Sequence, residues 1–300
     1  MAPAPSLPPS SSSAPAAGSD PVAPIPDAPA ALIETGSATG EGRNEHALVL
    51  ADYHAGLEAG LRQEGVSVPS QAADRREQVH SLLDDTGVER VVFLGDLAHS
   101  IGDPRDEERA ELEELFETVA DRVSITVVKG NHDGGIESVV DRAGIDEISV
   151  TPTDGTRLGD IGFAHGHTWP ASEVLDAPVV CVGHEHPAVR LTDSVGGQRI
   201  ERAWLRGDLD RRPFHAHHYE PGNSEADDAD TSKAEASDSD RTDSRPDGEL
   251  VVFPAFNDLL GGTWINVPEQ DFLAPFLPEG LTDGQAYLLD GTRLGDYRRV

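Results

Sequence analysis

The sequence contains very little cysteine and very little lysine. Cys181 is the only cysteine, which excludes an intrachain disulfide and gives no support for an oxidising compartment. It lies in the apolar run Val179–Val182, where a small buried core residue is expected in preference to a nucleophile. Lys129 and Lys233 are the only lysines, and all other cationic side chains apart from histidine are arginines.

Long apolar segments are also missing. No apolar run approaches the roughly 20 residues that a membrane-spanning helix needs. The first residues, MAPAPSLPPSSSSAPAAG, have neither the basic start nor the continuous apolar stretch of a secretory signal. We therefore expect a soluble, cytoplasmic protein without a membrane partner.

Positive charge is scarce in comparison with negative charge. The chain has 23 Lys and Arg against 55 Asp and Glu, a net charge of −32. A surface that seeks cations is one explanation, and adaptation to a cytoplasm of very high salt is the other. We favour the halophile-type explanation because the acids are spread along the whole chain. At molar salt the Debye length falls to roughly 3 Å, so this charge does not exclude a nucleic-acid substrate.

Two segments lack any periodic apolar pattern. Residues 1–43 are rich in Pro, Ala, Ser and Gly, and residues 220–248 are strongly acidic and contain few apolar residues. Both compositions are typical of disordered chain. We expect a disordered N-terminal tail over 1–43 and a domain over 44–300 that is interrupted by a disordered acidic insertion at 220–248.

The remaining pattern predicts an α/β fold. Short apolar runs alternate with amphipathic segments at 74–85 and 106–121, which favours helices between mostly parallel strands of a central sheet. The first group of expected strands comprises residues 46–51, 90–94, 124–128, 161–164 and 179–182. Later strands at 188–192, 199–205, 250–253 and 286–290 are not separated by long helices and indicate a second, mixed or antiparallel sheet. Two sheets flanked by helices would form a single α/β/β/α sandwich.

Polar residues with metal-binding side chains follow each of the first five expected strands. The motifs are Asp52-Tyr53-His54, Gly95-Asp96, Gly130-Asn131-His132-Asp133, His165-Gly166-His167 and Gly183-His184-Glu185-His186. Because sites in open α/β sheets form at the carboxyl ends of the strands, we expect these side chains to meet at one edge. Each motif alone is weak, whereas the ordered set, with every motif directly after an apolar run, is specific.

This ordered set resembles the calcineurin-like metallophosphoesterase superfamily. A narrower resemblance, to the ligase- and helicase-associated (Lhr-type, ICC-like) phosphoesterase branch, rests on GHEHPAV at 183–189 and FPAFNDLLGGTWIN at 253–266. The similarity covers roughly residues 45–290. It places the acidic insertion inside one domain, because the second segment follows the insertion.

The resemblance implies two adjacent divalent metal ions. Asp52, His54 and His186 would hold the first ion. Asn131, His165 and His184 would hold the second, and Asp96 would bridge both. Mixed nitrogen and oxygen ligands suit Mn²⁺, Fe or Zn²⁺, with Mn²⁺ favoured here. Two such ions would lower the pKa of a bridging water, so that hydroxide attacks phosphorus in line with the leaving oxygen.

The resemblance also implies roles for three further histidines. His132 would stabilise the transition state or protonate the leaving alkoxide. His99 stands where protein-phosphatase relatives carry an aspartate that pairs with the catalytic histidine, so we expect a catalytic role for it in preference to capping the following loop. A histidine at this position resembles the DNA-repair nucleases. His167 would contact substrate or support the ligands.

We therefore expect a Mn²⁺-dependent phosphodiesterase that acts on DNA ends or single-stranded DNA during repair, with an Lhr-type helicase or a DNA ligase as partner. Hydrolysis of small diesters such as cyclic nucleotides is the alternative, because no basic patch with interleaved aromatic residues is present. Arg62, Arg105 and Arg142 are the few candidates for phosphate contact. A non-catalytic scaffold is a third reading, which the intact ligand set disfavours.

Overall fold

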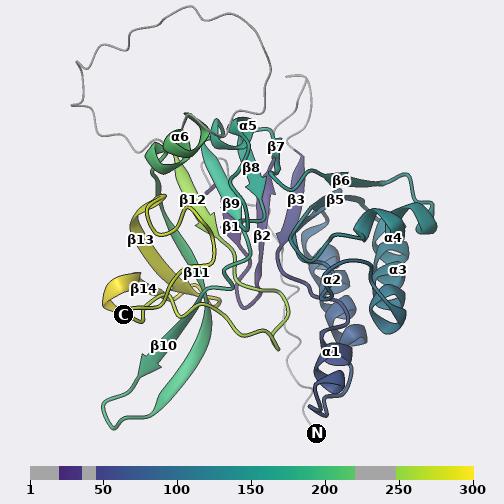
Figure 1. Cartoon of the computed structure of the whole chain (residues 1–300), viewed down its shortest axis with the longest axis horizontal. Helices are drawn as coiled ribbons and strands as arrows, with labels where there is room; N and C mark the ends of the chain where they lie inside the picture. The colour runs from purple at the N-terminus through teal and green to yellow at the C-terminus, as the bar shows by residue number, and fades with distance from the viewer. Residues whose placement is uncertain (1–19, 36–44, 220–247) are drawn as a thin grey trace, which may run out of the picture.

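Two β-sheets lie face to face in a computed structural model of the chain, and helices cover their outer faces (Figure 1). The structure describes residues 20–35, 45–219 and 248–300. This arrangement confirms the predicted α/β/β/α sandwich.

The first sheet has six strands in the order of the sequence. They are β1 (Val22–Pro24), β2 (Ala30–Glu34), β3 (His46–Leu50), β4 (Arg90–Leu94), β5 (Ser124–Val128) and β6 (Ile148–Thr151). Strands β3 to β6 pair in parallel, and β1 and β2 add an antiparallel edge. Its helices are α1 (Leu57–Gln63), α2 (Ala72–Thr86), α3 (Asp106–Ala120) and α4 (Ile136–Ala143). They lie together on the outer side of this sheet (Figure 1).

The second sheet runs in the order β14-β13-β11-β12-β9-β8-β7. Its strands are β7 (Thr156–Leu158), β8 (Ile161–Ala164), β9 (Val179–Val182), β11 (Gln198–Leu209), β12 (Glu249–Val252), β13 (Leu281–Leu288) and β14 (Arg293–Asp296). Strand β10 (Ala188–Thr192) pairs with the first part of β11 and forms a projecting hairpin (Figure 1). The shorter helical elements are α5 (Ser172–Leu175), α6 (Arg212–Tyr219) and the 3₁₀ turn η1 (Tyr297–Arg299).

Alternation along the central strands builds the core on both faces of each sheet. In β3, Ala47 and Val49 point into the space between the sheets, whereas Leu48 and Leu50 pack against the helices. In β9, Val179 and Cys181 face the first sheet, and Val180 and Val182 face the outer layer. Because side chains of a strand alternate with period two, continuous apolar runs are what strands buried on both faces require. Cys181 is fully buried, as the sequence predicts.

The assignment of strands to sheets differs from the sequence-based expectation at one point. Strands β8 and β9 were expected to join β3, β4 and β5 in one parallel sheet, but they form the parallel centre of the second sheet together with β12. Apolar runs in either sheet are buried on both faces, so the pattern does not distinguish between the two sheets.

The expected disordered tail over 1–43 is wrong for residues 20–35. Strand β2 pairs antiparallel with β3, and β1 pairs with β2. Val22, Ala31 and Ile33 are buried between the sheets, and the carboxylate of Asp20 pairs with Arg206 of β11 at 2.6 Å. Burial of this short apolar segment and its backbone pairing outweigh the Pro- and Ala-rich composition around it.

The predicted acidic insertion lies outside the described residues, apart from Gly248. The chain continues into β12, which pairs with β9 on one side and β11 on the other. The chain thus completes the same sheet after the insertion. Among the described residues, no helix has the length and apolar character that would let it cross a membrane.

Candidate metal centre

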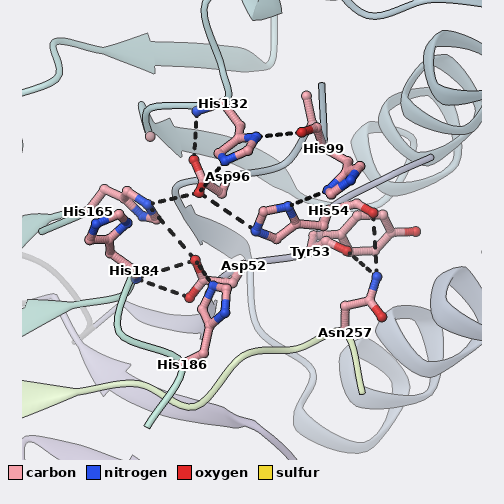
Figure 2. Close-up of polar contacts among 12 residues, drawn as sticks. Asp52, Tyr53, His54, Asp96, His99, His132, His165, His184, His186 and Asn257 are labelled. Carbon is pink, nitrogen blue, oxygen red and sulfur yellow. Dashed lines mark hydrogen bonds and ion pairs between the residues drawn. The ribbon is translucent and has the colours of Figure 1, made fainter. Parts of the chain in front are cut away.

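The loops after β3, β4, β5, β8 and β9 converge at one edge of the two sheets (Figure 2). Backbone hydrogen bonds join the first two loops, from the Asp52 N–H to the Gly95 carbonyl at 3.2 Å and from the His54 N–H to the Asp96 carbonyl at 2.9 Å. In the second sheet the Gly183 N–H donates to the His165 carbonyl at 2.9 Å. The predicted meeting of the five motifs at one edge is therefore seen, although two sheets contribute to it.

Unfavourable backbone conformations are concentrated at this edge. Nine non-glycine residues in the described part of the chain have a positive φ, and five of them belong to the predicted ligand set. These five are Asp52, His54, Asp96, His184 and His186. Left-handed backbone costs energy in residues with a side chain and is retained where function requires a particular orientation.

Two motif glycines allow the loops to approach one another. A Cβ atom on Gly95 would lie 2.1 Å from Nδ1 of His165, and one on Gly130 would lie 2.2 Å from Oδ1 of Asp96. Any side chain at either position would therefore displace a predicted ligand.

The first group of potential ligands consists of Asp52, His54 and His186, whose ligand atoms lie within 4.8 Å of one another. Nε2 of His186 is 3.1 Å from Oδ1 of Asp52. The group matches the set predicted for the first ion.

The second group consists of Asp96, His165 and His184, within the same limit of 4.8 Å. Oδ2 of Asp96 lies 3.2 Å from Nε2 of His165 and 3.6 Å from Nε2 of His54. This single oxygen therefore lies between the two groups, which is the position that a bridging ligand requires (Figure 2).

Three of these histidines have one ring nitrogen anchored and the other directed at a carboxylate. Nδ1 of His165 donates to the Leu94 carbonyl at 3.1 Å, and Nδ1 of His186 donates to the Gly261 carbonyl at 3.0 Å. Nδ1 of His54 lies 3.3 Å from Nδ1 of His99. The Nε2 atoms of all three are buried without a hydrogen-bond partner, because their carboxylate neighbours are near but not aligned. Anchored Nδ1 and unpartnered Nε2 are typical of metal-binding histidines, so this donor set fits divalent ions.

The pKa values of the two carboxylates and of His54 fit the assignment of these residues as metal ligands. Burial would raise the pKa of Asp52 and of Asp96, but the adjacent histidines hold both below the usual range. Burial would lower the pKa of His165, but the Asp96 carboxylate raises it to about 9. Burial lowers the pKa of His54 to about 3. The ionised carboxylates and the neutral ring of His54 have the protonation states that metal binding needs, whereas His165 would have to release a proton when an ion binds.

Asn131 and His167 each have a buried side-chain atom without a hydrogen-bond partner. Oδ1 of Asn131 is buried and has no hydrogen-bond partner, as expected of a side chain that reserves its oxygen for another ligand. The His167 ring centroid is 5.5 Å from that of His165 and 6.1 Å from that of His184. His167 thus lies beside the second group, outside both clusters of ligand atoms.

His132 is oriented by the backbone of His99. Nδ1 of His132 donates to the His99 carbonyl, and its backbone N–H donates to Oδ1 of Asp96 at 2.9 Å. The two imidazole rings are stacked at 5.9 Å, with an angle of 15° between their planes. The His99 side chain instead reaches His54 (Figure 2). The ring of His99 thus lies beside both His132 and the predicted ligand His54, and its catalytic role stays a prediction.

Three buried side chains that support the loops were not assigned a role from the sequence. Asp133 accepts from the N–H groups of Ala98 and Gly130, at 3.1 and 2.9 Å. Glu108 accepts from the His99 and Ser100 N–H groups, both at 2.7 Å.

The third is Asn257, whose side chain donates to the carbonyls of Tyr53 and His54 at 3.2 and 3.4 Å (Figure 2). Asp133 belongs to the motif at 130–133 and Asn257 to the segment at 253–266, so their place in these motifs could have indicated a role. Glu108 is one acid among many in α3 and carries no such signal.

The arginines proposed as phosphate contacts are engaged elsewhere. Arg62 pairs with Glu107, and Arg142 lies 3.8 Å from Glu113. Arg105 caps α3 through its backbone.

Similarities to known proteins are of two kinds, to a family model and to solved structures. The sequence of residues 46–205 matches the family model of the calcineurin-like phosphoesterase superfamily domain. Among solved structures, the Pseudomonas putida nuclease MPE is similar at 16% identity and a TM-score of 0.49, over 91% of this chain and 100% of that chain. The E. coli phosphoesterase Yfce is similar at 20% identity and a TM-score of 0.31, over 49% of this chain and 74% of that chain. No curated protein matches the sequence.

Proposed function

Because this chain belongs to the calcineurin-like phosphoesterase superfamily, we propose that it is a hydrolase that cleaves phosphodiester bonds with two divalent metal ions, Mn²⁺ being preferred and Fe or Zn²⁺ being alternatives. The observation that supports this most is the position of Asp96 Oδ2, 3.6 Å from His54 Nε2 and 3.2 Å from His165 Nε2. One carboxylate between two ligand groups favours a pair of ions over a single one.

In this proposal Asp52, His54 and His186 hold one ion, and Asn131, His165 and His184 hold the other. Asp96 contacts both. Bound ions would supply positive charge for the phosphoryl oxygens and increase the acidity of water. The chain's own contribution is to fix the ligands through the Leu94 and Gly261 carbonyls and to exclude water around Asp52 and Asp96, which are almost completely buried.

His132 is the proposed acid and charge-stabilising residue. Its Nδ1 proton is donated to the His99 carbonyl, which leaves Nε2 for the substrate, 4.0 Å from Oδ2 of Asp96. When protonated at Nε2, the ring can donate that proton to the leaving alkoxide or stabilise the charge on the phosphoryl oxygens. The ring of His99 is stacked on that of His132 and contacts Nδ1 of His54, so we assign it a role in supporting this predicted metal ligand.

The proposed substrate is DNA, as ends or single strands, in a repair reaction with an Lhr-type helicase or a ligase as partner. The motifs at 183–189 and 253–266 support this proposal. The acidic composition supports a cytoplasm of high salt, in which a chain of charge −32 can approach a polyanion. A small-diester phosphodiesterase is the second candidate, because Arg62 and Arg142 are paired with carboxylates and provide no extended basic groove.

The experiment that tests the proposal measures hydrolysis of bis-p-nitrophenyl phosphate and p-nitrophenyl phosphate by the full chain in molar KCl with Mn²⁺. We expect the diester to be the better substrate and its hydrolysis to require Mn²⁺. Labelled single-stranded and duplex DNA then separates a nuclease from a small-diester enzyme. Absence of turnover of every ester with Mn²⁺, Fe²⁺ or Zn²⁺ would contradict the proposal and favour a scaffold.

A further inference from the structure

A cleft of about 590 Å³ begins at the metal centre and lies between the β10–β11 hairpin and the segment after β12. His186, a predicted ligand, forms part of its wall. The other lining residues that matter here are Ile200, Arg202, Leu259, Leu260, Trp264 and Gln270. This volume lies within the usual range of small-molecule sites.

The segment that lines the cleft also positions the ligand. The Gly261 carbonyl accepts from Nδ1 of His186 at 3.0 Å, and a Cβ atom on Gly262 would lie 2.0 Å from the His186 carbonyl. Trp264 follows two residues later and forms a parallel bridge with Ala188 at the start of the hairpin. A group that enters the cleft is therefore adjacent to a phosphate held at the metal centre.

The lining combines an aromatic ring, aliphatic side chains and a cation. The guanidinium of Arg190 lies over the Trp264 ring, 5.4 Å from its centroid, and restrains the indole. Arg202 donates to the carbonyls of Ala255 and Phe256 at 2.9 and 3.1 Å. Within the part of the chain that the structure describes, Arg202 makes no ion pair. Asp258 also lines the cleft and its carboxylate acts on Arg202, so the polar part of the lining offers both a hydrogen-bond donor and an acceptor.

These features fit a flat, mostly apolar ring that carries hydrogen-bonding groups at its edge. A purely aliphatic chain would offer no polar partner to Asp258 and Gln270, and a bare phosphate would leave the aromatic and aliphatic wall in water. A nucleobase satisfies both parts, because its face stacks on aromatic rings and its edge accepts and donates hydrogen bonds.

We propose that this cleft is a nucleobase subsite, which binds the base attached to the phosphate at the metal centre through the indole of Trp264. The inference rests on the proposed function, since it places that phosphate at the ions. It narrows the substrate class to nucleotide esters, whether free or within a nucleic-acid strand.

The test is calorimetric titration of the full, Mn²⁺-loaded chain in molar KCl with AMP and with ribose 5-phosphate, which lacks the base. We expect AMP to bind roughly tenfold more tightly, as for one stacked base. In Trp264→Leu this preference should fall to about twofold or less, while Trp264→Phe retains most of it. The affinity for ribose 5-phosphate should stay unchanged in both variants, which shows that the metal centre is intact.

Phe272→Leu is the matched control, because Phe272 packs against Tyr297 and is not among the residues that line the cleft. Equal affinities for AMP and ribose 5-phosphate in the unmodified chain would overturn the inference. A preference that survives in Trp264→Leu, or no binding of AMP at all, would also overturn it. Binding is measured without turnover, so a chain that prefers AMP but hydrolyses no diester refutes the proposed function separately.

Discussion

The two sheets contribute to the metal centre in different ways. The loops after β3 and β4 are joined to each other by backbone bonds, including those from the His54 N–H to the Asp96 carbonyl and from the Ala55 N–H to the Leu97 carbonyl, at 2.9 and 2.7 Å. The loop after β5 is joined to them through the Asp133 carboxylate, which accepts hydrogen bonds from the N–H groups of Ala98 and Gly130. The carboxylate half of the site is therefore fixed by the chain alone.

The histidines from the second sheet reach the first sheet through side-chain contacts, among them the hydrogen bond from Nδ1 of His165 to the Leu94 carbonyl at 3.1 Å. The His184 N–H donates to the Asp52 carboxylate at 3.2 Å, and the His165 and His186 rings face Asp96 and Asp52 at 3.2 and 3.1 Å. Most of these contacts use the carboxylates that ions would bind. The difference indicates that bound metal would complete the connection between the sheets, in addition to its chemical role.

Removal of the shared carboxylate should have the largest effect. Asp96→Asn keeps the shape of the side chain but removes its negative charge, which lies between the two ligand groups. We expect diester hydrolysis to fall by about 10³-fold or more, with little loss of folding stability, because one substitution weakens both predicted ion sites. Steady-state kinetics and thermal unfolding measure the two effects. Activity within tenfold of the unmodified chain would contradict a two-ion centre.

His132→Asn should reduce turnover by about 10²–10³-fold, the contribution of one positioned acid. Mn²⁺ binding should stay within about twofold, because His132 is not a ligand of either predicted ion; its ring nitrogen belongs to a third possible group, with His54 and His99, whose ligand atoms lie within 4.8 Å of one another. The measurements are kcat and a Mn²⁺ titration by calorimetry. His80→Asn is the matched control, since His80 hydrogen-bonds to Thr118 on the helical layer. Loss of metal in His132→Asn would make His132 a ligand.

Metal removal tests the contrast between the sheets directly. Dialysis against EDTA should lower the unfolding temperature by about 5–10 °C, from a loss of roughly 2–3 kcal/mol of binding energy. Hydrogen exchange should increase more at 165–167 and 183–186 than at 52–55 and 96–99, because the contacts of His184 and His186 with Asp52 use a carboxylate that an ion would bind. Equal increases in both regions would show that the metal does not connect the sheets preferentially.

Much of the fold, and the meeting of the motif side chains at one edge, could be inferred from the sequence because each motif follows an apolar strand directly. The pattern did not reveal that β8 and β9 belong to the second sheet, since Val179–Val182 is buried on both faces in either arrangement. It also missed β1 and β2, because strands of three and five residues at a sheet edge give a weak periodic signal.

The orientation of the side chains at the site could not be predicted from the sequence. A sequence places His99 three residues after Asp96 but does not state which way its ring turns. The ring direction depends on Glu108, which accepts from the His99 and Ser100 N–H groups and fixes the loop. Nor does composition reveal that Asp52 and His54 adopt positive φ, with values of 58° and 48°. These features arise from tertiary contacts among distant segments.

The smallest effect should come from His99→Ala, which separates the backbone of this residue from its ring. The carbonyl that orients His132 remains in the variant, whereas the ring contact to Nδ1 of His54 is lost. We expect Mn²⁺ affinity to weaken by about tenfold, the lower end for loss of a residue that supports a ligand. At saturating Mn²⁺, kcat should recover to within about threefold of the unmodified chain. A kcat that stays as low as in His132→Asn at every Mn²⁺ concentration would instead assign the ring of His99 to the chemical step, and so restore the role expected from the sequence.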